Sequence, residues 1–222
     1  MINFTIKPCI YGSLACCILG IPYISVITGI GYAFIRETFL TKLACLLYKF
    51  SLKRASNVLF QNSEDLETFV KRRIINKEKA ILTPGSGVDT ERFLTSYCKN
   101  TPKPEKLVFL MISRMLWDKG IGELVQASRI LKESGYDFEV WLLGPIDKGN
   151  PSAVEEETIR RWEMENLVNY LGSTDDVRHF ICQSSCMVLP SYYREGIPRS
   201  LLEAMTMGKP IITADSPGCR EL

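Results

Sequence analysis

The stretch LVFLMISRMLWDKGIGELVQASRILKES, residues 107–134, decides the fold class. Its first seven residues form an unbroken apolar run, which is typical of a strand buried on both faces. A polar loop follows, and residues 120–134 carry apolar side chains at helical spacing. This order of strand, loop and helix predicts one unit of a parallel sheet that is covered by helices.

The same alternation continues to the end of the chain. We expect strands at 138–144, 168–172, 186–190 and 210–215, and helices at 153–165, 175–183 and 198–208. In parallel sheets of this kind, ligands bind at the carboxyl ends of the strands. The loops that should carry function are therefore 114–119, 144–152, 172–175 and 191–199.

The first half follows a similar but less regular pattern. Strands are expected at 23–28, 58–62 and 80–84, and helices at 13–19, at 37–53 and after Ser63, which is a candidate helix cap. The apolar positions of 37–53 recur at helical spacing, which predicts a buried face. Residues 95–106 are polar, contain two prolines and are interpreted as a linker.

Composition excludes some classes of protein. Among the 222 residues, 46% are hydrophobic and 23% are charged, and the net charge is +2. These values are typical of a globular protein and give no support for nucleic-acid binding. The eight cysteines follow no repeating spacing, which indicates reduced, mostly buried thiols.

An uncharged apolar run covers residues 8–35. Its length fits a membrane span or a signal segment. Four glycines and Pro22 interrupt it, and the short run YISVIT at 23–28 reads as a buried strand. We therefore favour a soluble domain over a membrane span. Two interpretations remain open for residues 13–35 and the basic Lys49, Lys53 and Arg54. They form either a membrane-surface contact or a buried strand and a solvated helix end.

The loop RMLWDKG at 114–120 contains two cations between a strand and a helix. Arg114 and Lys119, together with the free amides of the helix N-terminus, make a candidate diphosphate site. The alternative is a solvated loop in which Arg114 pairs with a nearby acid.

The stretch SYYREGIPRSLLEAM at 191–205 holds Glu195 and Glu203. Gly196 and Pro198 break any single helix, so Glu195 should lie in a loop and Glu203 within the following helix. A glycosidase pair is the alternative. No apolar pocket is expected around either glutamate, which disfavours that pair.

These motifs resemble a known family. The segments ISRMLWDKGIGELVQA, VWLLGP, LGSTDDV, VLPSYYREGIPRSLLEAM and GKPIITADSPGCREL are similar to the donor-binding domain of the retaining glycosyltransferases of family four. The resemblance implies the α/β GT-B fold, with two Rossmann-like parallel-sheet domains that face a cleft. GSGVDTERF at 85–93 resembles the crossover between the two domains.

The resemblance also implies roles for matching residues. Arg114, Lys119 and Glu195 would be catalytic, and Glu203 would hold the ribose hydroxyls. The donor site would further include Gly144, Leu171, Gly172, Gly196, Ile197, Pro198, Ser200 and Leu201. No metal or other cofactor is expected, because Arg and Lys would take the place of the metal and no Asp-x-Asp pair occurs.

GIPYISVITGIGYAFIRETFL at 20–40 resembles the acceptor side of a subgroup that extends sugars on polyprenyl-diphosphate lipids. The matching positions are Gly29, Gly31 and Tyr32, and Thr28 stands where many members carry histidine. The implied partners are a nucleotide sugar, expected to be a UDP-sugar, and a lipid-linked or oligosaccharide acceptor. The implied location is the cytoplasm, at the inner face of the plasma membrane.

The expected domains are a partial acceptor-side domain at 1–94, the linker at 95–106 and a donor domain at 107–222 that stops short of the family's last elements. A remnant that only binds nucleotide or a partner is an alternative to an enzyme, and the E-x7-E spacing argues against a sugar-nucleotide epimerase. His179, Cys182 and Cys186 have loose metal-ligand spacing but are interpreted as structural. Trp117, Trp141 and Trp162 are expected in the core or at a cleft wall.

Overall fold

The computed structural model describes residues 1–31, 34, 38–102 and 104–222. Two compact units are present, and neither is continuous along the chain. Unit 1 comprises Met1–Gly87, Tyr193–Pro198 and Asp215–Leu222. Unit 2 comprises Val88–Tyr192 and Arg199–Ala214.

Unit 1 is built on a four-stranded sheet in the order β1-β2-β3-β4. All neighbouring strands are parallel. The strands are β1 (Ile2–Phe4), β2 (Ile24–Ile27), β3 (Asn57–Phe60) and β4 (Ala80–Leu82). The last three were predicted, whereas β1 was not, because its three residues carry no pattern that separates a strand from a loop.

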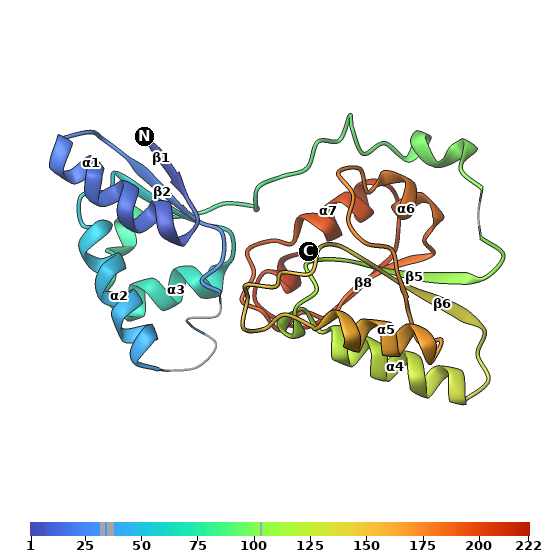
Figure 1. Ribbon diagram of the computed structural model, residues 1–222. Helices are drawn as coiled ribbons and strands as arrows, with labels where there is room; N and C mark the ends of the chain where they lie inside the picture. The colour runs from blue at the N-terminus through green and yellow to red at the C-terminus, as the bar shows by residue number, and fades with distance from the viewer. Residues whose placement is uncertain (32–33, 35–37, 103) are drawn as a thin grey trace. The chain divides into compact units, whose positions relative to one another are not determined.

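The main helices of unit 1 are α1 (Ser13–Leu19), α2 (Phe39–Ser51) and α3 (Ser63–Lys71), seen beside the strands in Figure 1. A π-helical turn, η1 (Pro8–Gly12), precedes α1, and the short 3-10 helices η3 (Lys77–Lys79) and η6 (Cys219–Glu221) also belong to the unit. The core centres on Phe69, whose ring lies edge-on to Tyr48 and Phe60 at centroid distances of 5.0 and 5.1 Å. Such edge-to-face pairs stabilise a core beyond simple burial of area.

Unit 2 is built on a five-stranded parallel sheet in the order β7-β6-β5-β8-β9. Its strands are β5 (Leu107–Ile112), β6 (Phe138–Leu143), β7 (Asn169–Tyr170), β8 (Cys186–Leu189) and β9 (Ile211–Thr213). Its helices are α4 (Ile121–Glu133), α5 (Glu156–Met164), α6 (Arg178–Gln183) and α7 (Arg199–Thr206), with the 3-10 helices η4 (Thr95–Asn100) and η5 (Trp117–Lys119). Figure 1 shows α4 and α5 on one side of this sheet and α6 and α7 on the other.

The order of the strands in unit 2 reverses at one point. From β5 the chain runs outward through β6 to β7, and it then returns to β8 on the other side of β5. In open parallel sheets, the crevice beyond the carboxyl ends of the strands at such a reversal is the ligand-binding position. The loops that follow β5 and β8 therefore carry the candidate site of this unit.

Helix α2 corrects one prediction. Its apolar stripe was expected to be buried, but the buried residues are instead Thr41, Ala44, Tyr48 and Ser51. Phe39 and Phe50, from the apolar stripe, keep 81% and 64% of their surface exposed. Periodicity identifies residues that share a face, but it does not say which face meets the core.

Two further predictions change in detail. The cap of α3 is Asn62 and not Ser63, because the Asn62 side chain accepts a hydrogen bond from the amide of Asp65. Part of the expected linker forms η4, and Cys98 in that helix is joined to Cys182 by a disulfide. The prediction that the cysteines are reduced is therefore wrong for this pair.

The uncharged run from residue 8 to residue 35 is divided, in the part that the structure describes, among η1, α1 and β2. No helix within the described residues has the length and hydropathy to cross a bilayer.

Candidate active site

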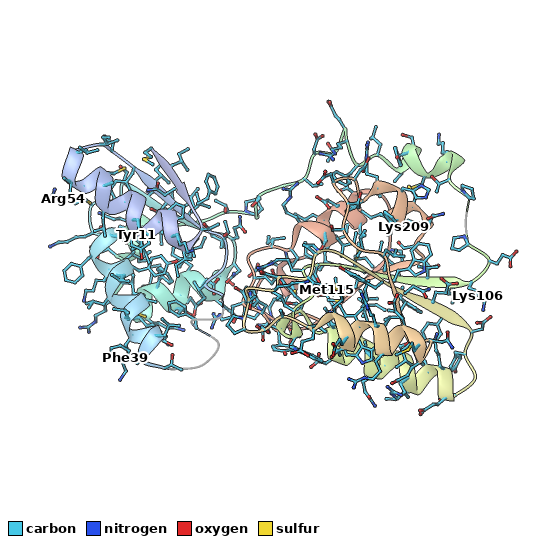
Figure 2. The ribbon with its side chains drawn as sticks, viewed as in Figure 1. Tyr11, Phe39, Arg54, Lys106, Met115 and Lys209 are labelled. Atoms are coloured by element: carbon cyan, nitrogen blue, oxygen red, sulfur yellow. A yellow bond between two sulfur atoms is a disulfide. The ribbon has the colours of Figure 1, made fainter. Side chains whose placement is uncertain are left out.

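The loop after β5 carries the first two candidate residues. The Arg114 guanidinium forms an ion pair with Asp147 at 2.8 Å, and both side chains are partly exposed. Met115, labelled in Figure 2, ties this loop to the loop after β6, since its amide donates to the carbonyl of Pro145 at 2.9 Å. An exposed pair of this kind contributes only about 0–1 kcal/mol, so the guanidinium can exchange its partner at little cost.

Lys119 lies at the point where the strand order reverses. It is buried within η5, and Gly120 follows it in the left-handed region at φ 80°. A side chain at Gly120 would overlap the carbonyl oxygen of Pro190, the residue after β8. The amide of Tyr192 also donates to the carbonyl of Asp118 at 3.1 Å. The loops after β5 and β8 therefore pack directly against each other.

Gly144 and Gly172 meet at the carboxyl ends of β6 and β7. The Gly144 amide donates to the Gly172 carbonyl at 2.7 Å, and the Tyr170 hydroxyl donates to the Gly144 carbonyl at 2.9 Å. Gly144 has φ 144°, and a Cβ there would overlap the carbonyl oxygen of Ser113. The backbone at this edge is thus closely packed, and the predicted residues Gly144, Leu171 and Gly172 lie together.

Helix α7 carries Ser200, Leu201 and Glu203. Only 9% of Glu203 is exposed, and burial raises the pKa of its carboxyl above the ordinary value, while Arg199 and Arg92 oppose the shift. The Arg199 guanidinium lies 3.4 Å from the Glu203 carboxylate. The burial of Glu203 was not predicted. Leu201 is fully buried, which leaves only its backbone for ligand contact.

Glu195 lies outside any helix, as predicted, in the loop 193–198 of unit 1. Backbone groups of this loop have partners elsewhere in the same unit. The Gly196 amide donates to the Thr28 carbonyl at 2.9 Å, and the Gly31 amide donates to the Arg194 carbonyl at 3.2 Å. The Asn62 side chain donates to the Glu195 carbonyl at 3.0 Å.

Glycines allow this close packing. A Cβ on Gly29 would overlap the Gly196 amide nitrogen, and a Cβ on Gly196 would overlap the side-chain oxygen of Gln61. The structure therefore brings Thr28, Gly29 and Gly31 together with the Glu195 loop. Tyr32, the fourth predicted acceptor-side residue, lies outside the described residues.

Sequence reasoning missed the residues that hold the Glu195 loop. Asp65 is fully buried, and its carboxylate accepts a hydrogen bond from the Arg194 guanidinium at 2.9 Å. Burial raises the pKa of Asp65, while Asn62 and Arg194 oppose that change. In the sequence, Asp65 reads only as an acid in the first turn of a helix.

Several of the smaller candidates have partners within the structure. Cys182 is disulfide-bonded, and the described part of the chain contains no group of three or more His, Cys, Asp or Glu side chains that could hold a metal. The rings of Trp117 and Trp162 pack edge-on at 5.7 Å, and the Trp141 indole donates to Glu139.

The chain is 31% identical over 225 aligned residues to the N,N'-diacetylbacillosaminyl-diphospho-undecaprenol alpha-1,3-N-acetylgalactosaminyltransferase of Campylobacter jejuni, covering 95% of this chain and 57% of that protein. It is 28% identical to the UDP-Gal:alpha-D-GlcNAc-diphosphoundecaprenol alpha-1,3-galactosyltransferase of Escherichia coli, covering 96% of this chain and 56% of that protein. The chain therefore spans little more than half the length of these relatives.

Among solved structures, HepE of Anabaena in complex with UDP and glucose superposes with a TM-score of 0.79 at 21% identity, over 99% of this chain and 60% of that one. A UDP-forming trehalose-phosphate synthase of Burkholderia vietnamiensis superposes with a TM-score of 0.76 at 13% identity, over 99% of this chain and 60% of that one. These likenesses show the GT-B fold. The family described as glycosyl transferases group 1 matches residues 97–222, more than half of the sequence. The chain belongs to the glycosyl transferases group 1 family.

Proposed function

We propose that the protein is a retaining glycosyltransferase that moves a sugar from a nucleotide sugar to a lipid-linked or oligosaccharide acceptor, in the synthesis of a surface polysaccharide or glycan. One observation carries this proposal. Arg114, Lys119 and the start of α7 follow the two strands, β5 and β8, between which the strand order reverses. That edge combines cations with helix amides, which suits the diphosphate of a nucleotide sugar.

In the proposed reaction the nucleoside diphosphate leaves the donor sugar, and fixed positive charges stabilise the negative charge that develops on it. Arg114 would leave Asp147 for the diphosphate, and Lys119 is already held at the reversal point by η5. The amides in the first turn of α7, at Ser200 and Leu201, would add further donors. Stabilisation of a developing charge by preorganised donors is worth several kcal/mol for each well-placed group. In this proposal the two cations do the work that a metal ion does elsewhere, so no cofactor is required.

The two glutamates receive different roles. Glu203 would accept hydrogen bonds from the ribose hydroxyls, which would replace the water that burial has removed from its carboxylate. Glu195 would contact the donor sugar or stabilise charge at its anomeric carbon. The remaining proposed donor contacts are those at Gly144, Leu171, Gly172, Gly196, Ile197 and Pro198, and the proposed acceptor-side residues are Thr28, Gly29 and Gly31.

UDP as the nucleotide and a polyprenyl diphosphate as the acceptor anchor are supported by the relatives. One relative's name specifies UDP-Gal, and two names specify a diphospho-undecaprenol lipid. HepE was solved with UDP bound. We further propose the domain boundaries 1–94 and 107–222 with the linker 95–106 between them, and a cytoplasmic location at the inner face of the plasma membrane.

The test is a transfer assay with a UDP-sugar and an acceptor sugar carried on a polyprenyl diphosphate. We expect release of UDP and a product whose new linkage keeps the anomeric configuration of the donor, seen by NMR. Arg114→Ala should lower the rate by about 100-fold, since one group that stabilises transition-state charge is lost. Arg129→Ala is the matched control, because Arg129 is also partly exposed and paired, with Glu165. Inversion, or equal activity of the two variants, would contradict the proposal.

A further inference from the structure

Helix α2 of unit 1 exposes a stripe of large apolar side chains. Phe39, Leu43, Leu46 and Phe50 are all exposed, and they follow the spacing i, i+4, i+7, i+11. Residues at this spacing lie on one face of a helix. The opposite face is the one that packs on the core. The helix is thus amphipathic with its apolar side turned outward, and Figure 2 labels Phe39 at its first turn.

Two hollows adjoin this stripe, with volumes of about 430 and 370 Å³. The larger is lined by Leu46 and Phe50 together with the basic side chains of Lys49, Lys53, Arg73 and Lys79. The smaller shares Leu46 and Lys49 with it and adds Lys42 and Arg72. No carboxylate is among the described residues that line either hollow. The surface is therefore apolar along its centre and cationic at its side.

We propose that this surface, the α2 face, docks onto a membrane that contains anionic phospholipids. Phenylalanine and leucine would enter the boundary between headgroups and acyl chains, while the lysines and arginines would contact lipid phosphates. Helix α2 has 13 residues, a length of about 20 Å, so it would lie in the interface and not cross the bilayer. This inference rests on the proposed location of the protein at the membrane and names the surface that would hold it there.

The charge of the face favours a membrane over a protein partner. Lysine is depleted in protein–protein interfaces, whereas this face presents Lys42, Lys49 and Lys53 beside its apolar stripe. A second copy of the chain, paired about a two-fold axis, would bring these like charges toward each other. Anionic headgroups match both the sign of the charge and the apolar stripe.

Sedimentation of the full protein with lipid vesicles tests the proposal. We expect binding to vesicles of phosphatidylglycerol and phosphatidylcholine, much weaker binding to phosphatidylcholine alone, and a loss of binding as salt is raised. The double variant Phe39→Ser/Phe50→Ser should bind at least tenfold more weakly. The matched control is Ile130→Ser/Met164→Ser, which removes two exposed apolar side chains from helices of unit 2 and should bind like the unaltered protein.

A second pair of variants tests the charge. Lys42→Glu/Lys49→Glu should abolish binding to the anionic vesicles, whereas Lys106→Glu/Lys148→Glu should leave most of it. No binding by the unaltered protein, or full binding by Phe39→Ser/Phe50→Ser, would overturn the proposal. A dimer that this double variant dissociates, with no vesicle binding, would identify a second copy as the occupant and would also overturn it. UDP binding measured on the same samples distinguishes failure of membrane docking from failure of the proposed function. If only the docking proposal is wrong, the protein still binds UDP.

Discussion

Glu203 is a carboxylate on helix α7 that packing removes from water. In the folded chain only 9% of it remains exposed. A buried carboxylate that gives up water is costly to ionise unless hydrogen bonds replace the water.

The burial of Glu203 predicts a particular pH dependence. Burial raises the pKa of this carboxyl above its ordinary value of 4.5 in the folded state. The folded protein therefore holds the proton to higher pH than the unfolded chain, and the stability that this provides is lost as pH rises through the raised pKa. Glu203→Gln should be more stable than the unaltered protein at pH 7, and the difference should shrink as pH falls through the raised pKa and stop changing below about 4.5.

The measurement is the free energy of unfolding by urea across this range of pH. Glu105→Gln is the control, because Glu105 is exposed and its replacement should change little at any pH. If the gain in stability from Glu203→Gln were smaller at pH 7 than at pH 4, the raised pKa of Glu203 would be contradicted.

Other site residues show what a single sequence can and cannot predict. The positions of Arg114 and Lys119 were predicted because they follow a strand with an unbroken apolar pattern, and the ends of parallel strands share an edge. Asn62 and Asp65 were missed as supports of the Glu195 loop, because their partners lie 133 and 129 positions away in the sequence. No local pattern carries information on contacts of that kind.

At the scale of elements, the predicted strands and helices are largely confirmed. The strand β5, with its unbroken run LVFLMI, and the helix α4 lie within a residue or two of the expected bounds. The orientation of α2 was wrong, because its apolar residues face outward and a tyrosine and small residues face the core. Tertiary packing, and not periodicity, decided which face was buried.

The cap of α3 gives a prediction at this scale. Asn62 accepts a hydrogen bond from the Asp65 amide at 2.8 Å and donates one to the Glu195 carbonyl. Asn62→Ala should lower the free energy of unfolding by about 2 kcal/mol, from the lost cap and the lost second bond. Asn62→Ser keeps an oxygen for the cap and should recover about half of that loss.

Asn76 offers a matched control for this experiment. It occupies the same position before η3 but makes no capping hydrogen bond through its side chain. Asn76→Ala should therefore change the free energy of unfolding by no more than about 0.5 kcal/mol. Equal effects of Asn62→Ala and Asn76→Ala in urea unfolding would show that the cap contributes nothing.

At the scale of the whole molecule, the bond between Cys98 and Cys182 closes a loop of 84 residues within unit 2. The pairing could not be predicted, because eight scattered cysteines allow many partners and cytosolic thiols are usually reduced. Closing a loop of this length stabilises a folded chain by about 4–5 kcal/mol in the chain-entropy model.

Reduction should therefore lower the stability of unit 2. Dithiothreitol should shift the urea midpoint of the unaltered protein downward, and Cys98→Ser should start at the lower midpoint and not respond to the reductant. Mass spectrometry of intact protein should show a gain of about 2 Da on reduction, since a disulfide takes up two hydrogens. An unaltered midpoint in dithiothreitol would show that this bond does not contribute to stability.

We infer a nucleotide-diphosphate site at the carboxyl ends of β5 and β8, where the strand order reverses. Isothermal titration of UDP into the protein tests this inference, with Lys119→Ala as the variant. Lys106→Ala is the control at the opposite end of β5, where Figure 2 labels it. Circular dichroism checks that both variants are folded. We predict one UDP site, binding weakened about 10- to 100-fold in Lys119→Ala by the loss of a charge-assisted hydrogen bond, and no change in Lys106→Ala. If the unaltered protein did not bind UDP, or if Lys119→Ala bound UDP as tightly as the unaltered protein, the inferred site would be contradicted.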